Sequence, residues 1–215
     1  VRHGLNELPK LIEAKSLIRW PPVPDITKEL HPIPEEVLHN ANLAKGRGLT
    51  LVVWPHRWEH DKGPGELLHL EETYGESHQL GWILLGQQFT QIPQEFEAFR
   101  EHAGDRLLQA GWVERDVYLG WLQVAEWVCS TAVHEYFGIA VVEAMLAGCL
   151  PWLPERLSYP ELLPSIARGL SPMHPPGASD EILAAIRQHL SPAIAPTAVT
   201  ALEDAMNQAA PLARR

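Results

Sequence analysis

The sequence has few cysteines and no long apolar run. Its two cysteines, Cys129 and Cys149, lie in short apolar stretches, which favours reduced core thiols in a cytosolic protein over a disulfide or a metal site. No apolar run approaches the ~20 residues that a membrane-spanning helix needs, and no signal peptide is visible. We therefore expect a cytoplasmic protein that does not bind a membrane.

Lysine is also missing from most of the chain, since none follows Lys62. The net charge is −10, and it is uneven: residues 1–62 carry 9 basic and 8 acidic side chains, whereas residues 63–215 carry 8 basic and 19 acidic ones. Nucleic-acid phosphates are bound by clustered Lys and Arg. The acidic part is therefore not expected to hold a nucleic acid by itself.

The apolar residues, 46% of the 215, suffice for a sizeable core. Short apolar runs alternate with helix-like segments, which is typical of strand–helix–strand units in a parallel sheet. The expected strands are residues 49–54, 82–85, 106–109, 125–129 and 149–153, with 167–170 as a possible edge strand. We predict an α/β fold, a Rossmann-like parallel sheet with helices on both faces.

The two ends of the chain differ from this middle part. The chain begins at Val1 rather than Met, so we expect a piece of a longer protein. Residues 1–25, with a helix at 3–14 and four residues of which three are proline at 21–24, are predicted to end a preceding domain and form a stiff linker. Residues 26–195 are predicted to form the Rossmann-like domain, and residues 196–215 a last helix and tail.

Residues 130–151 form the stretch that carries most information. Glu135 is predicted to lie in a loop after a buried strand, and Glu143 about a turn and a half into the following apolar helix. Gly138 lets a ligand approach the backbone, and the amides of Ile139 and Ala140 at the helix start suit a diphosphate. A buried carboxylate needs a polar partner. Two interpretations stay open: the acids meet ligand hydroxyls, or Glu135 caps the helix and Glu143 makes an internal salt bridge.

Further candidates follow the other predicted strands, at the sheet edge where ligands bind in open α/β folds. Arg57 and Lys62 are suitable cations for a diphosphate, although a solvated charged loop is the alternative. Gly86 marks the end of the next strand. Trp112 follows the strand after that and either stacks on a nucleobase or packs in the protein.

The central stretch resembles the donor-site motif of retaining GT-B glycosyltransferases. That motif is His/Ser-Glu-x-Phe-Gly, four residues, Glu-Ala, and then a small-residue Gly-x-Pro segment. Here it reads His134-Glu135-Tyr136-Phe137-Gly138, then Glu143-Ala144, then Gly148-Cys149-Leu150-Pro151, with two residues between the glycine and the proline. Glycosyltransferases of this group also place an Arg and a Lys five residues apart after the first strand of the C-terminal domain, as Arg57 and Lys62 stand here.

Three stretches narrow the resemblance to one family. They are residues 54–62 (WPHRWEHDK), residues 84–93 (LLGQQFTQIP) and residues 130–161. Together they resemble the C-terminal, donor-binding half of the tRNA-queuosine α-mannosyltransferase family, within glycosyltransferase family 4. The similarity covers roughly residues 14–170, and residues 175–215 carry nothing diagnostic.

The resemblance implies GDP-mannose as donor, transfer with retention, and queuosine in tRNA as acceptor, bound mainly by an N-terminal domain absent from residues 1–215. No cofactor is implied, and without an Asp-x-Asp signal no metal is expected at the diphosphate. The implied catalytic residues are Arg57, Lys62 and Glu135. The implied donor-binding residues are Gly86, Trp112, His134, Phe137, Gly138, Ile139, Ala140 and Glu143.

Within this scheme the cations and the amides near Ile139 stabilise the leaving diphosphate. Glu143 accepts hydrogen bonds from the ribose and Glu135 from the sugar. His56, His60 and His134 either contact phosphate or sugar or are structural. Two other functions remain open: a GT-B enzyme that uses another nucleotide sugar and acceptor, and a non-catalytic nucleotide-binding domain.

Overall fold

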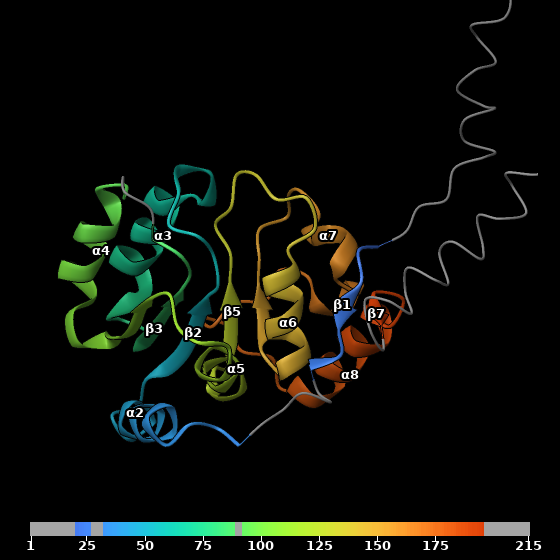
Figure 1. Cartoon of the computed structure of the whole chain (residues 1–215), viewed down its shortest axis with the longest axis horizontal. Helices are drawn as coiled ribbons and strands as arrows, with labels where there is room; N and C mark the ends of the chain where they lie inside the picture. Colours follow the sequence, from blue (N-terminus) through green and yellow to red (C-terminus); the bar gives the residue numbers. More distant parts are fainter. Residues whose placement is uncertain (1–19, 27–31, 89–91, 196–215) are drawn as a thin grey trace, which may run out of the picture. The chain divides into compact units, whose positions relative to one another are not determined.

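The computed structural model describes residues 20–26, 32–88 and 92–195 (Figure 1). The helices predicted at 3–14 and in the 196–215 tail lie outside these residues. The chain separates into two compact units, one of Val1–Pro24 with Pro192–Arg215 and one of Asp25–Ser191. In the first, β1 (Val23–Pro24) pairs in parallel with β7 (Ile194–Ala195). The second contains all the candidate site residues.

The second unit is built on a five-stranded sheet in which every pair of neighbours is parallel. Its strands are β2 (Thr50–Trp54), β3 (Leu80–Leu85), β4 (Leu107–Gly111), β5 (Trp127–Cys129) and β6 (Leu150–Trp152). Their spatial order is β4-β3-β2-β5-β6. The predicted α/β fold with a parallel sheet is confirmed.

Helices connect the strands and cover both faces of the sheet. They are α2 (Glu35–Gly46), α3 (Pro64–Leu70), α4 (Glu95–Ala103), α5 (Arg115–Val124), α6 (Ile139–Ala147), α7 (Tyr159–Leu162) and α8 (Ser179–Leu190). From β2 to β4 the chain moves one way along the sheet, and from β5 to β6 it moves the other way. Because crossovers between parallel strands are right-handed, α3 and α4 lie on one face and α5 and α6 on the other.

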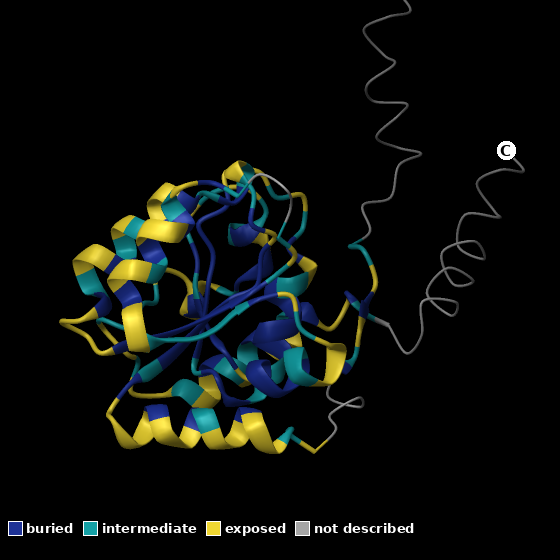
Figure 2. Cartoon of the chain, turned by 60° about the vertical axis from the view of Figure 1, so that its left-hand side comes forward, coloured by how far each residue is buried: buried dark blue, intermediate teal, exposed yellow. Residues whose placement is uncertain are grey.

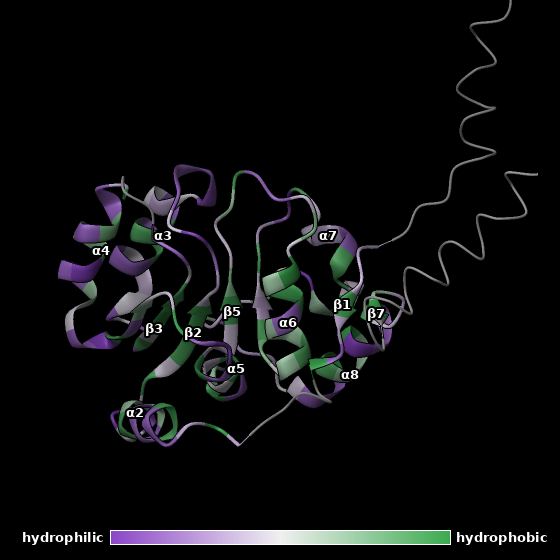
Figure 3. Cartoon of the chain, viewed as in Figure 1, coloured by the Kyte–Doolittle hydropathy of each residue, from purple (hydrophilic) through white to green (hydrophobic). Residues whose placement is uncertain are grey.

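The core consists of the apolar strand residues and the helix faces that cover them. Leu51, Val52, Val53 and Trp54 have no exposed surface, and Figure 2 shows the strands buried inside a shell of exposed helix faces. Figure 3 shows that α6 is hydrophobic over most of its length, whereas α4 carries hydrophilic residues outward. A parallel sheet buried on both sides explains why its strands read as continuous apolar runs.

Two short elements differ from simple expectation. The helix after β2 ends as α3 at Leu70 and continues as a π-helical turn, η3 (Glu71–Gly75). The edge strand predicted at 167–170 is wrong, because Ala167 ends a 3-10 turn, η5 (Ser165–Ala167), and a further turn follows at residues 168–169. Arg168 donates hydrogen bonds to the carbonyls of Leu163 and Pro160, which ties the segment to α7 rather than to the sheet.

Cys129 and Cys149 are free and buried, as predicted, and burial raises the pKa of both thiols. Within the described part of the chain, no helix is both long enough and apolar enough to cross a bilayer.

The strand order places a topological switch between β2 and β5. The connections leaving these two strands run in opposite directions along the sheet, and in open α/β sheets ligands bind beyond the carboxyl ends of strands at such a point. The loop after β2 carries Arg57 and Lys62, and the loop after β5 carries His134 and Glu135. Two distant stretches of sequence are thereby brought to one edge of the sheet.

Candidate functional site

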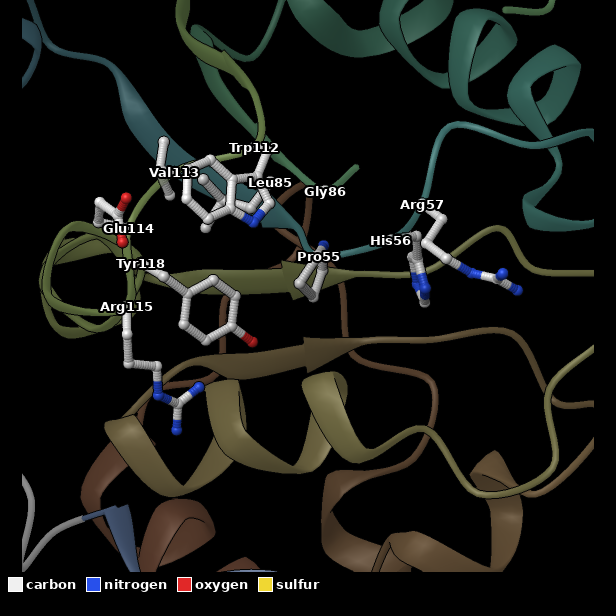
Figure 4. A pocket seen from close by; sticks show the side chains of 10 residues that line it. All are labelled: Pro55, His56, Arg57, Leu85, Gly86, Trp112, Val113, Glu114, Arg115 and Tyr118. Atoms are coloured by element: carbon white, nitrogen blue, oxygen red, sulfur yellow. The ribbon is translucent and has the colours of Figure 1, made fainter. Parts of the chain in front are cut away.

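A cavity of about 410 Å³ opens at the carboxyl ends of β2, β3 and β4 (Figure 4). The end of β2, the end of β3 and the start of α5 contribute its walls. The lining residues are Pro55, His56, Arg57, Leu85, Gly86, Trp112, Val113, Glu114, Arg115 and Tyr118. The cavity therefore lies at the sheet edge where the sequence placed its candidate residues.

The loops after β2 and β5 are joined by backbone hydrogen bonds. The carbonyl of Asp61 accepts from the amides of Val133 at 2.9 Å and His134 at 3.2 Å. Thr131 Oγ1 donates to the carbonyl of Lys62 at 2.8 Å and accepts from the indole N–H of Trp54 at 3.0 Å. These bonds fix one loop against the other, so the functional groups of both are held in register.

Lys62 lies at the centre of this contact, in the 3-10 turn η2 (His60–Lys62). Its Nζ donates to the carbonyl of His134 at 2.8 Å and lies 3.5 Å from Glu135 Oε2 and 3.2 Å from Asp61 Oδ2. Only 10% of its side chain is exposed. The structure thus brings Lys62, His134 and Glu135 together, and the carboxylates of Asp61 and Glu135 balance the charge of Lys62.

Arg57 is placed differently. Its guanidinium pairs with Glu59 Oε2 at 3.0 Å, and 54% of the side chain is exposed. In Figure 4 it lies beside His56 and points away from Trp112, Arg115 and Tyr118. An exposed ion pair of this kind contributes at most about 1 kcal/mol, so the guanidinium can exchange Glu59 for an anionic ligand at little cost.

The turn before α6 has the predicted form, since the helix begins directly after Gly138. Gly138 is the N-cap residue with φ of 87°, in the left-handed region that favours glycine. Ile139 and Ala140 form the first turn of a nine-residue helix, whose first amides have no acceptor within the helix. Phe137 is half-buried, and its carbonyl accepts from Ser158 Oγ at 3.1 Å. The positive end of α6 is therefore presented beside Glu135.

Glu143 already has protein partners. It is 6% exposed, and Arg115 binds both of its oxygens, with distances of 2.7 and 3.2 Å. Tyr118 donates from its hydroxyl to Glu143 Oε2 at 3.0 Å, and burial, together with this carboxylate, raises the pKa of Tyr118. Of the two interpretations of Glu143, the internal salt bridge is thus present.

Two further predicted residues, Trp112 and Gly86, line the cavity together with Arg57, whereas Lys62, Glu135 and Glu143 are not among its lining residues. Trp112 is 64% exposed, so its indole face is available and packing in the core is a minor role. Gly86 lines the cavity, but a glycine is required at this position because of the neighbouring chain. An added Cβ would lie 1.9 Å from the carbonyl oxygen of His56. Gly86 therefore allows β2 and β3 to end side by side.

Three residues with clear roles here were not singled out from the sequence. Arg115 and Tyr118 hold Glu143, and Arg156 donates to the carbonyls of Thr131 and Ala132 at 2.9 and 3.0 Å, which supports the loop after β5. The three-residue spacing of Arg115 and Tyr118 on one helix is the only sequence signal for their shared target. Nothing local in the sequence indicates Arg156.

Comparison with models of known protein families finds no match. Among curated proteins, the tRNA-queuosine alpha-mannosyltransferase of Drosophila melanogaster is 41% identical over 114 residues, which cover 53% of this chain and 30% of that protein. The predicted resemblance to this family is confirmed. The aligned region spans less than a third of the relative, so the similarity concerns one part of that protein.

Solved structures with the same fold are GT-B glycosyltransferases. A glycosyltransferase from Rickettsia africae matches with a TM-score of 0.64 and 14% identity, covering 98% of this chain and 62% of that one. The sucrose-phosphate synthase of Thermosynechococcus elongatus matches with a TM-score of 0.56 and 20% identity, covering 90% and 49%. Anabaena HepE, solved with UDP and glucose, matches with a TM-score of 0.51 and 20% identity over 72% and 42%. These identities establish a shared fold.

Proposed function

We propose, on the premise that this chain is a relative of tRNA-queuosine α-mannosyltransferase with the fold of a GT-B glycosyltransferase, that it is the donor-binding part of a retaining mannosyltransferase. Its donor is GDP-mannose and the acceptor is queuosine in tRNA. The observation that carries the proposal is the meeting of Lys62, Glu135 and the amino end of α6 at the switch point of the sheet.

In this proposal the diphosphate binds between the cations and the helix start. Lys62 Nζ is nearly buried beside Glu135, so its charge acts in surroundings where water screens it weakly. The amides of Ile139 and Ala140 add donors and the positive end of the helix dipole. Arg57 turns from Glu59 to the phosphates. These groups stabilise the negative charge that develops on the leaving diphosphate.

The sugar and the ribose are assigned to the two acids. Glu135 accepts hydrogen bonds from mannose hydroxyls. Glu143 accepts from the ribose, for which it retains capacity: a carboxylate offers about four acceptor positions, and three are filled by Arg115 and Tyr118. In this proposal the internal ion pair orients Glu143 without saturating it, so the residue forms the salt bridge and also binds the ribose.

For the transfer step we propose attack by the acceptor on the face from which the diphosphate leaves, which retains the α configuration. The bond between the anomeric carbon and the phosphate oxygen breaks, the bond to the acceptor oxygen forms, and the diphosphate takes the acceptor's proton. Lys62, Arg57 and the helix amides supply the positive charge for which other enzymes use a metal. Added EDTA is therefore expected to leave the rate unchanged.

The acceptor is proposed to bind mainly through parts of the relative that lie outside the aligned region. Residues 63–215 carry 19 acidic and 8 basic side chains, a balance that disfavours tRNA binding. The aligned part spans 30% of the relative. We therefore expect residues 1–215 alone to bind the donor weakly and not to transfer mannose. Transfer of mannose from GDP-mannose to tRNA by this chain alone would refute that expectation.

The donor assignment is tested by titrating GDP, UDP and ADP against intrinsic tryptophan fluorescence. The exposed Trp112 lines the cavity, so a bound nucleobase is expected to change its emission. Saturable binding with GDP tightest supports the proposal. Tighter binding of UDP or ADP favours an enzyme that uses another nucleotide sugar, and absence of saturable binding of any nucleotide to the whole protein favours a non-catalytic domain.

The role of the cations is tested by Arg57→Ala and Lys62→Ala in the whole transferase. Each is expected to lower the transfer rate by about two orders of magnitude or more, the loss typical of a transition-state charge contact. Arg47→Ala and Lys45→Ala are matched controls, because these cations flank the amino end of β2 and pair with Asp105 and Glu126. Near-normal turnover of either site variant would exclude its role at the phosphates.

A further inference from the structure

His56 is a buried polar residue at the cavity wall that the proposed donor site does not use. It is 5% exposed and lines the cavity between Pro55 and Arg57. Its Nε2 is one of three buried side-chain nitrogens in the described residues that have no hydrogen-bond partner, the others being the indole nitrogens of Trp58 and Trp121. Of the three residues, only His56 lines this cavity (Figure 4).

An unpartnered buried nitrogen is unusual, because native proteins pair nearly all such groups. His56 is held in place by its neighbours. Its ring packs edge-on against Trp54, with the centroids 5.0 Å apart, and Trp54 is anchored to Thr131. Its carbonyl oxygen lies 1.9 Å from the position that a Cβ on Gly86 would take. The unpartnered Nε2 is therefore not the result of a loosely held side chain, and a hydrogen-bond acceptor bound at the cavity wall would satisfy it.

The surroundings keep the imidazole uncharged. Burial and the positive charge of Lys62 lower the pKa of His56 to about 3, although Asp61 acts in the opposite direction. A neutral imidazole carries one N–H donor and one acceptor. His56 thus lies next to Arg57 in the chain and within electrostatic reach of Lys62, the two cations assigned to the diphosphate, and it differs from both in having no charge.

We propose that His56 is a donor-binding residue whose imidazole Nε2–H donates a hydrogen bond to a phosphate oxygen of the bound nucleoside diphosphate. This inference rests on the proposed function, since it takes the same nucleotide as its ligand. A phosphate oxygen is the suitable partner because it accepts hydrogen bonds only. The base-stacking candidate Trp112 lies at the other end of the cavity, away from His56 (Figure 4).

In this proposal His56 destabilises the free protein and stabilises the complex with the nucleotide. With no ligand, Nε2 is buried without a partner, which destabilises the folded chain. When a nucleotide binds, the phosphate oxygen satisfies it. An apolar ring of similar shape is therefore expected to leave the free protein at least as stable while it weakens binding, which a purely structural histidine would not do.

The test compares His56→Phe, His56→Gln and the wild-type chain by calorimetric titration with GDP. Phe keeps a planar ring and removes the donor, and Gln places an uncharged N–H near the position of Nε2. We expect the Phe variant to bind GDP about ten-fold or more weakly, with a thermal midpoint at or above the wild-type value, and the Gln variant to stay within about three-fold. His69→Gln, an exposed change on α3, is the control. Unchanged GDP binding by a folded His56→Phe chain would overturn the proposal.

A second measurement needs no stable Phe variant. In the wild-type chain labelled with ¹⁵N-histidine, the Nε2 signal of His56 is assigned by its loss in His56→Gln and followed during GDP titration. We expect it to shift on saturation. If the amides of Gly138, Ile139 and Ala140 shift but the His56 signal does not, the nucleotide binds without His56 and this inference fails alone. If no signal shifts at saturating GDP, the proposed function fails as well.

Discussion

Two buried glutamates, Glu71 and Glu143, each bind an arginine and an aromatic side chain. They differ in how many acceptor positions of the carboxylate are filled by the protein. Glu71 has no exposed surface and accepts from the indole of Trp82 at 2.5 Å, from His102 Nδ1 at 3.1 Å and from both terminal nitrogens of Arg106. All four acceptor positions of the carboxylate are thereby used. Glu143 is bound by Arg115 and Tyr118 through three hydrogen bonds.

The two carboxylates also lie at different places in the fold. Arg106, the partner of Glu71, donates to the carbonyl of Leu80, the first residue of β3, whereas Glu143 lies next to two cavity-lining residues at the carboxyl end of the sheet. The Arg106 side chain is 11% exposed and that of Arg115 is 47% exposed. From this difference we expect Glu71 to have a structural role and Glu143 to accept a hydrogen bond from a ligand.

The largest expected effect follows from removing the saturated carboxylate. In Glu71→Ala, Arg106 stays largely buried without its counter-charge, so the free energy of unfolding is expected to fall by about 3–5 kcal/mol. Urea denaturation at neutral pH measures it. The affinity for GDP, measured well below the unfolding midpoint, is expected to stay at the wild-type value. A stability loss under about 1 kcal/mol would show that Glu71 is not the structural member of the pair.

Glu143→Ala is the matched change at the cavity. Arg115 is half exposed, so water can replace the lost carboxylate, and the stability loss is expected to be about 1–2 kcal/mol. GDP affinity is expected to fall about ten-fold or more because the ribose acceptor is gone. Calorimetric titration and urea denaturation of the two alanine variants side by side separate the effects. If Glu143→Ala binds GDP like the wild type, Glu143 does not contribute to nucleotide binding and does not differ from Glu71 in this respect.

The histidines of the two regions, His102 and His56, also differ in whether they have a partner. This difference predicts the smallest of the expected effects on stability. His102 is bonded to Glu71, while His56 is buried without a partner at Nε2 and has its pKa lowered from 6.5 to about 3. The unfolded chain binds a proton at this position as the pH falls through 6.5, and the folded chain does not. The depressed pKa therefore makes the folded state lose stability toward acid.

His56→Phe removes this loss. Between about pH 7.5 and about pH 5.5, the wild type is expected to lose about 1 kcal/mol more unfolding free energy than the variant. Urea denaturation at several pH values measures the difference, and His69→Gln is the control for a general histidine effect. Parallel pH profiles for the wild type and His56→Phe would mean that His56 is not held neutral in the folded chain.

Much of the fold could be predicted from the sequence because a parallel sheet leaves a strong local signal. The run at residues 49–54 was expected as a strand and is β2 (Thr50–Trp54), and the helix expected after Gly138 is α6 (Ile139–Ala147). The strand ends then place the candidate residues at one edge by topology alone. The meeting of Lys62 with Glu135, 73 residues apart, was predictable for this reason.

The partners of the buried acids could not be predicted in the same way. Arg115 and Glu143 are 28 residues apart and come from different helices, and Arg106 and Glu71 are 35 apart, so no local pattern pairs them. The orientation of Arg57 toward Glu59 and the missing partner of His56 depend on side-chain packing. A sequence pattern identifies the sheet edge, and only coordinates distinguish a saturated carboxylate from an available one.

The most direct test of the central claim follows the indole N–H signals of two tryptophans in ¹⁵N-labelled chain during GDP titration. Trp112 lines the cavity and Trp82 donates to Glu71, so each reports on one of the two regions. The account predicts saturable shifts at Trp112 and at the amides of Lys62, Ile139 and Ala140, with Trp82 unmoved. Saturation by GDP with shifts centred on Trp82, and none at Ile139 or Ala140, would contradict it.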